Sequence, residues 1–158
     1  LGFMLPTTKM VDAIYALALV HLTPAPMTPG AQMESTDYFT RHNLTVNQQR
    51  DGTGYALSAL TAGQKKDLVL SNRLRTMPGR VAIYGWHRTN GKPIQPLSTV
   101  HGQGYADYSH GIRLISATAF VNGKPRALAD ILQDPGISAA VSSEGPITLS
   151  NQLLASLQ

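Results

Sequence analysis

The chain has 158 residues, of which 42% are hydrophobic and 14% charged, and its formal net charge is +4. A chain of this size and composition can bury a sizeable apolar core, so we expect a single domain over residues 1–158. Cysteine is absent, which excludes a cysteine nucleophile, a thiolate metal site and a disulfide framework.

The distribution of apolar and basic residues argues against two further classes of protein. No apolar run reaches the roughly 18 residues that a membrane-spanning helix needs. The basic residues are scattered, with Lys65-Lys66 as their one adjacent pair, so we expect no nucleic-acid partner. The chain begins at Leu1 without a methionine, so we expect a processed or truncated chain. Together with its low charge and many Thr, Ser, Asn and Gln residues, this favours a secreted or cell-envelope protein.

Helices are predicted in the first third of the chain. Thr7 or Thr8 can cap a helix whose apolar residues recur at three and four positions as far as Leu22. Several prolines follow, so residues 23–33 are expected to form an extended connector. Ser35 or Thr36 then caps a second helix over about residues 37–50.

Strand patterns dominate from residue 67 onward. We expect strands at 67–71, 80–87 and 93–98, the last at a sheet edge because of its prolines, and a long strand at 111–121. Asn-Gly pairs predict hairpin turns at 89–92 and 122–124. Short helices are expected at 127–133 and about 150–157. The predicted class is α+β, with N-terminal helices, a central mostly antiparallel sheet and short C-terminal helices.

Residues 84–116 concentrate the side chains that can carry chemistry. This stretch holds three of the five histidines, the single tryptophan and three of the six tyrosines. Two-residue alternation along the strand at 80–87 predicts Ile83, Gly85 and His87 on one face, with Tyr84 and Trp86 on the other. We therefore expect His87, at the strand end, to border a cleft.

Acid–base hydrolysis is the chemistry that this stretch favours. His101 and His110 are candidate acid and base, Asp107 can orient them, and Ser109, Ser98 or a water is the candidate nucleophile. Ser109 and His110 are neighbours that point to opposite faces of a strand, so His101 is the better base for Ser109. The predicted catalytic residues are His101, Asp107, His110, Arg113, Tyr105, Tyr108 and Ser109, with Arg113 stabilising an anion and a tyrosine donating a proton.

Three other interpretations remain open from the sequence. Aromatic rings can form a platform for sugars, with predicted binding residues Trp86, His87, Tyr84 and Arg88. His87, His101, Asp107 and His110 are acceptable zinc ligands, although no cofactor is expected because their spacing matches no compact metal motif. Alternatively, the same side chains only satisfy backbone groups beneath loops, with Asp107 paired to Arg113.

Two resemblances involve the same stretch. The run from Ser109 to Leu114, SHGIRL, resembles the SHGC-I-R-L signature of the L,D-transpeptidase catalytic domain, and His101-Gly102 is similar to its upstream His-Gly. The family's nucleophilic cysteine is missing here, so that activity is not expected. The wider pattern of YGWH, PIQPLS and HxxxYxDYSHGIRL resembles a family of secreted proteins of unassigned function.

These observations predict an exported hydrolase that acts on a polymer of the cell envelope or surroundings, either peptidoglycan or another polysaccharide. The alternatives are a non-catalytic module that binds a glycan through its aromatic residues, and a metal-dependent hydrolase.

Overall fold

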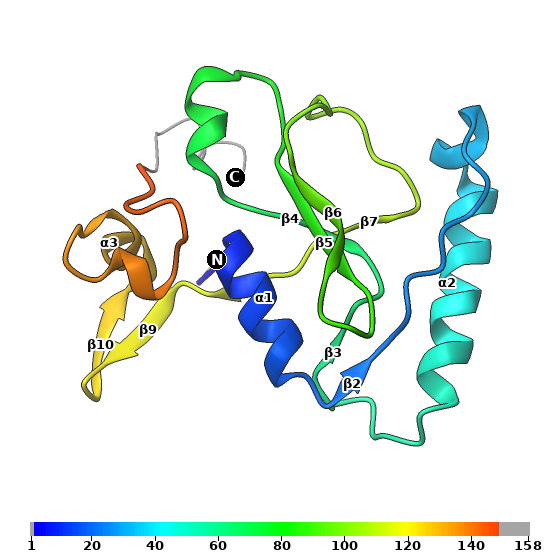
Figure 1. The fold of residues 1–158 in the computed structure, drawn as a ribbon, viewed down its shortest axis with the longest axis horizontal. Coiled ribbons are helices and arrows are strands. Elements are labelled where there is room, and N and C mark those ends of the chain that lie inside the picture. Colours follow the sequence, from blue (N-terminus) through cyan, green and yellow to red (C-terminus); the bar gives the residue numbers. More distant parts are fainter. Residues whose placement is uncertain (1, 149–158) are drawn as a thin grey trace.

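The computed structural model describes residues 2–148 and has the predicted α+β architecture, with about 30% helix and 24% strand. Helix α2 lies at one side of the molecule, and α3 with the β9–β10 hairpin lies at the opposite side (Figure 1). The largest sheet and helix α1 occupy the space between them. In this part of the chain no helix is both long enough and apolar enough to cross a bilayer.

Helix α1 spans Thr8–Leu17 and is capped as expected, with the Thr7 side chain accepting a hydrogen bond from the amide of Met10. The predicted extension of this helix to Leu22 is wrong. Strand β2 (Val20–His21) follows instead and pairs in parallel with β3 (Thr61–Ala62). The backbone groups after residue 18 therefore bond to a distant strand, which local periodicity cannot reveal.

Helix α2 spans Thr36–Asp51, and Ser35 caps it by accepting from the amide of Tyr38, as the sequence predicted. The connector before it is extended up to a 3₁₀ turn at Ala31–Glu34. Its chain is fixed by the hydroxyl of Tyr108, which bonds both the amide and the carbonyl of Met27. The connector thus ties α2 to the centre of the molecule.

The central sheet has four strands in the order β6-β5-β4-β7. These are β6 (Pro93–Ser98), β5 (Ile83–His87), β4 (Lys66–Leu68) and β7 (His110–Gly111). The pairs β4–β5 and β5–β6 are antiparallel, while β4–β7 is parallel. The proline-bearing strand is at the edge, as predicted, and the Asn-Gly turn connects it to β5.

The predicted alternation along β5 is wrong. Gly85 and Trp86 both have positive φ angles, 106° and 56°, and the register with β6 shifts between Ile83 and Gly85. This bulge turns Tyr84 and His87 toward helix α1, where both contact Asp12, and it leaves Trp86 on the other side, against α2 residues. A bulge of this kind re-aims side chains without a clear sequence signal.

The long strand predicted at 111–121 is also wrong, because three short strands replace it. After β7, strand β8 (Ile115–Ser116) pairs with β1 (Phe3–Met4), and β9 (Thr118–Val121) pairs with β10 (Lys124–Ala127). Each piece has a different partner, so the chain bends between them. The predicted hairpin turn at 122–124 does connect β9 and β10.

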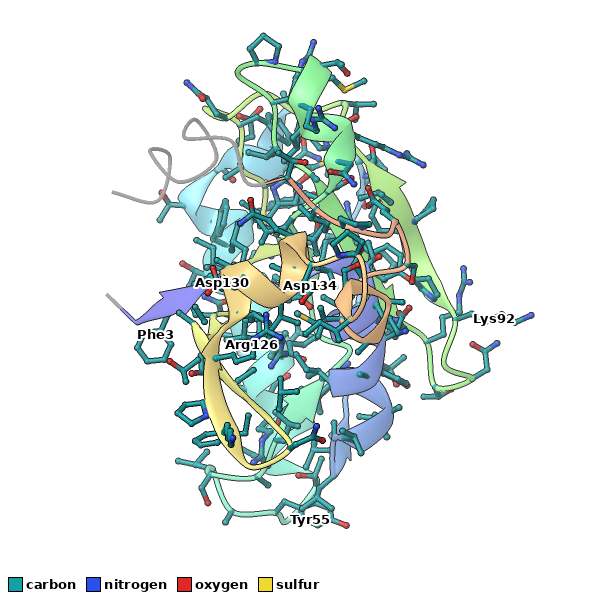
Figure 2. All side chains as sticks on the ribbon, turned by 90° about the vertical axis from the view of Figure 1, so that its left-hand side faces the viewer. Phe3, Tyr55, Lys92, Arg126, Asp130 and Asp134 are labelled. Atoms are coloured by element: carbon teal, nitrogen blue, oxygen red, sulfur yellow. The ribbon has the colours of Figure 1, made fainter. Side chains whose placement is uncertain are left out.

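Helix α3 (Leu128–Gln133) packs beside this hairpin, and an ion pair between Arg126 and Asp134 at 3.3 Å joins the two elements (Figure 2). Apolar residues from both chain ends form the core here: Met4, Leu70, Leu128, Ile131, Leu132 and Ile147. Short 3₁₀ turns complete the fold at Asn72–Thr76 and Ser138–Ala140. The helix predicted at 150–157 lies outside the described residues.

Candidate functional site

Three rings of the predicted site meet in the loop before β7. His101 stacks on Tyr105, with ring centroids 4.4 Å apart and planes 5° from parallel. The ring of His110 stands edge-on to both, at 5.2 Å from His101 and 5.7 Å from Tyr105. The glycine-spaced loop makes this possible because Gly102 bridges to Arg80 beside β5, which folds the loop back on itself. The sequence therefore predicted the membership of this cluster.

Asp107 is the buried anion behind these rings. Its Oδ1 accepts from the amide of Ser109 at 2.8 Å and from the Ser109 hydroxyl, and its Oδ2 accepts from the Tyr105 hydroxyl at 3.1 Å. Burial alone raises the pKa of this carboxyl, but the two bonds from Ser109 and the nearby His110 outweigh burial and hold the pKa below its ordinary value. Asp107 is therefore ionised at neutral pH.

Ser109 is fully buried, and its hydroxyl already donates to Asp107. A hydroxyl in that position has no access to a substrate, so the geometry favours water over Ser109 as the attacking group. Ser109 instead fixes the carboxylate whose other oxygen holds Tyr105.

His110 is a mostly buried, neutral imidazole. Its Nδ1 accepts a long hydrogen bond of 3.5 Å from the amide of Asp107, which places the ring proton on Nε2. Nε2 has no hydrogen-bond partner, and the Asp107 carboxylate is 3.8 Å away. Burial lowers the pKa of His110, and Lys66, Lys65 and His101 lower it further, against the opposing effect of Asp107.

Tyr105 and His110 border an open cleft of about 330 Å³. The remaining lining residues are largely apolar: Phe39, Leu68, Val81, Gln103, Ala106, Gly111 and Ile112. Burial, followed by the charge and hydrogen bond of Asp107, raises the pKa of Tyr105 to about 12. The phenol therefore keeps its proton at neutral pH beside the cleft and is suited to donating it.

The other predicted site residues lie elsewhere. Trp86 and Tyr108 are 4% and 2% exposed and form a buried aromatic cluster with Tyr38 of α2. His42 completes this cluster, with its ring 5.0 Å from Tyr108. No sugar can stack on a ring buried in this way, so Trp86 does not form the predicted platform. Tyr108 is not the predicted proton donor, because its hydroxyl bonds the backbone of Met27.

A second cluster of polar side chains lies beside helix α1. Asp12 Oδ1 accepts from Tyr84 at 2.9 Å and contacts Nε2 of His87 at 2.8 Å, and His87 stacks on Tyr15 at 4.6 Å. His87 is buried, so it does not border the cleft as the sequence predicted. The exposed Arg88 contributes its carbonyl, which accepts from the Tyr15 hydroxyl. These contacts tie β5 to α1 and are structural.

Arg113 is separated from the ring cluster as well. It approaches Asp67 at 3.7 Å and donates to the carbonyl of Thr61, so the predicted pairing with Asp107 does not form. Burial raises the pKa of Asp67 to about 6, although Arg113 opposes this. Within residues 2–148, no three His, Asp or Glu side chains come together in an arrangement that could hold a metal ion.

Sequence reasoning missed Gln103 and Ile112, which line the cleft, and Asp12, which anchors His87. Gln103 had one signal, its place inside the HGQGY loop. Comparison of the chain with protein-family models, curated proteins and solved structures found no match. The function of the site is therefore argued from its own geometry.

Proposed function

We propose that the chain is an exported hydrolase that acts on a polymer of the cell envelope or surroundings by acid–base catalysis at His101 and Tyr105. One observation carries the proposal: Tyr105 and His110 contact the buried Asp107 and border an open cleft, and His101 stacks on Tyr105. Titratable groups gathered in a cleft with displaced pKa values are typical of catalytic sites.

The accessible pair performs the proton transfers. His101 is partly exposed, and its imidazole takes a proton from the attacking water. Tyr105 donates its hydroxyl proton to the leaving oxygen. In the free protein the Tyr105 hydroxyl donates a hydrogen bond to the Asp107 carboxylate, but the leaving alkoxide is a much stronger base and takes the proton.

The buried residues Asp107 and His110 act by holding His101 and Tyr105 in place. Asp107 holds the Tyr105 hydroxyl, and its own position is fixed by Ser109. The neutral ring of His110 packs against the edges of His101 and Tyr105 and keeps them in place without adding a charge next to them. Asp107 and His110 are therefore positioning residues in this mechanism.

The two alternatives receive less support. A glycan-binding platform needs exposed aromatic faces, and Trp86 and Tyr108 are buried. A metal-dependent mechanism needs convergent ligands, and the described residues offer no such group of three.

The test measures soluble products released from purified peptidoglycan and from neutral and acidic polysaccharides. We expect His101→Ala to lower the rate by at least about 10²-fold, the usual contribution of a general acid or base. His21→Ala is the matched control, because His21 is an exposed histidine whose ring bonds only the carbonyl of Tyr15. An unchanged rate in His101→Ala, or no product from any polymer with folded protein, contradicts the proposal.

A further inference from the structure

A second half of about 260 Å³, lined mainly by aliphatic side chains, adjoins the cleft beside Tyr105. The two halves share the lining residues Leu68, Val81, Gln103 and Ile112, so they lie next to each other. We call the second half the apolar arm. Apart from Gln103 and Arg80, every side chain that lines it is a hydrocarbon, and Leu74 and Leu114 line this half but not the half beside Tyr105.

Two aliphatic side chains of the apolar arm are unusually exposed to solvent. Ile112 is 73% and Leu114 is 54% accessible to solvent, although both line the arm. Exposed aliphatic side chains around a concave surface gain free energy when an apolar group covers them. The arm is therefore suited to an aliphatic chain and poorly suited to a bare sugar ring.

Gln103 stands where the two halves of the cleft meet. It is exposed and lines both halves. Its side-chain amide offers two N–H donors, which suit a carbonyl oxygen located between the reactive rings and the apolar arm. Such a donor also stabilises the negative charge that develops on that oxygen during hydrolysis.

We propose that the bond hydrolysed is an acyl ester carried by the polymer, with the acyl chain in the apolar arm, its carbonyl oxygen at Gln103 and the polymer's oxygen at Tyr105. This inference rests on the proposed function and adds the class of bond to it. An ester supplies each of these groups: an acyl chain for the apolar arm, a carbonyl oxygen for Gln103 and a leaving oxygen for Tyr105.

The reaction balances without any further reactant. Water adds to the acyl carbon, and one of its protons passes to His101. The tetrahedral intermediate then breaks the bond between the acyl carbon and the polymer's oxygen, which takes the proton of Tyr105. His101 returns its proton to the Tyr105 oxygen through solvent, so the products are one carboxylic acid and one hydroxyl group.

The experiment compares p-nitrophenyl esters with acyl chains of two to twelve carbons, using the rate above that of His101→Ala. The value of kcat/KM should rise about fourfold per methylene until the arm is filled, the factor that corresponds to about 0.8 kcal/mol per buried CH₂. Leu114→Arg places a charge in the apolar arm, so it should abolish the rise for long chains and leave the acetyl ester unaffected. Phe120→Arg is the matched control, since it changes another exposed apolar residue, which lies on the β9–β10 hairpin.

The outcomes separate the two proposals. Hydrolysis that depends on His101 but not on chain length, or an equal loss in both arginine variants, overturns the acyl inference and leaves the proposed function standing. Polymer cleavage that releases no carboxylic acid does the same. If long-chain carboxylates bind in competition with one another but neither ester nor polymer is cleaved, the hydrolase proposal itself fails.

Discussion

Replacing His42 with leucine tests the energetics of the aromatic cluster that supports the site. His42 is fully buried between Trp86 and Tyr108, and neither of its ring nitrogens makes a hydrogen bond of normal geometry. Burial, followed by the positive charge of Lys65, lowers the pKa of His42 from 6.5 to about 4, although the nearby Ala25 carbonyl opposes this. The folded protein thus keeps this imidazole neutral where the unfolded chain protonates it.

The lowered pKa of His42 determines the sign and the size of its effect on stability. Between pH 6.5 and 4 the unfolded chain binds a proton at His42 that the folded chain does not, so the contribution to stability is complete above pH 6.5 and is lost as pH falls. The displaced pKa of His42 corresponds to about 3 kcal/mol of unfolding free energy. Asp67 affects stability with the opposite pH dependence, because its pKa is raised to about 6 in the folded protein. The pH dependence of wild-type stability therefore does not isolate the contribution of His42.

The assay is urea unfolding of wild type and His42→Leu at several pH values from 4 to 7. We expect the variant to gain about 3 kcal/mol relative to wild type on going from pH 7 to pH 4. Tyr38→Phe is the control, because it removes a hydroxyl from the same cluster but no group that titrates in this range, and its effect should not vary with pH. A difference between wild type and His42→Leu that is constant with pH refutes the reasoning.

Two further predictions concern the bulge and the buried carboxylate. Gly85→Ala should destabilise the protein by about 1–3 kcal/mol in thermal unfolding, because φ at this residue is 106° and the new Cβ would lie 3.3 Å from Val11. Gly104→Ala is the control, and it should leave stability unchanged because there is open space at its Cβ. Asp107→Asn should cost about 1–3 kcal/mol of stability through weakened hydrogen bonds. It should also lower the pKa of Tyr105, measured by ultraviolet titration, and an unchanged pKa would contradict the assigned contact.

The sequence predicted those parts of the fold that depend on local signals. Ser35 and Thr7 were identifiable as caps, and Asn-Gly turns identified both hairpins, because these motifs act over four residues or fewer. The stretch from Gly111 to Val121 was mispredicted because its apolar residues are compatible with one strand, while three different partner strands divide it. Partners that are distant in sequence leave no periodic pattern.

The candidate site was likewise predictable from the sequence only in part. His101, Tyr105, Asp107 and His110 lie within ten residues, so their clustering was predictable from the sequence. Which of them reach solvent was not predictable, because this depends on how the loop packs on strand β5. The misplacement of His87 comes from the bulge in β5, where Gly85 and Trp86 both have positive φ angles, a conformation that is uncommon for tryptophan.

The most direct test of the central claim is the turnover of Tyr105→Phe on a polymer that the wild-type protein cleaves. The substitution removes one oxygen atom from the edge of the cleft and one hydrogen bond to Asp107, so the unfolding midpoint should stay close to that of wild type. The account predicts a loss of at least about 10²-fold in kcat, because the phenol that protonates the leaving oxygen is removed. A folded Tyr105→Phe variant that cleaves the polymer at the wild-type rate would contradict it.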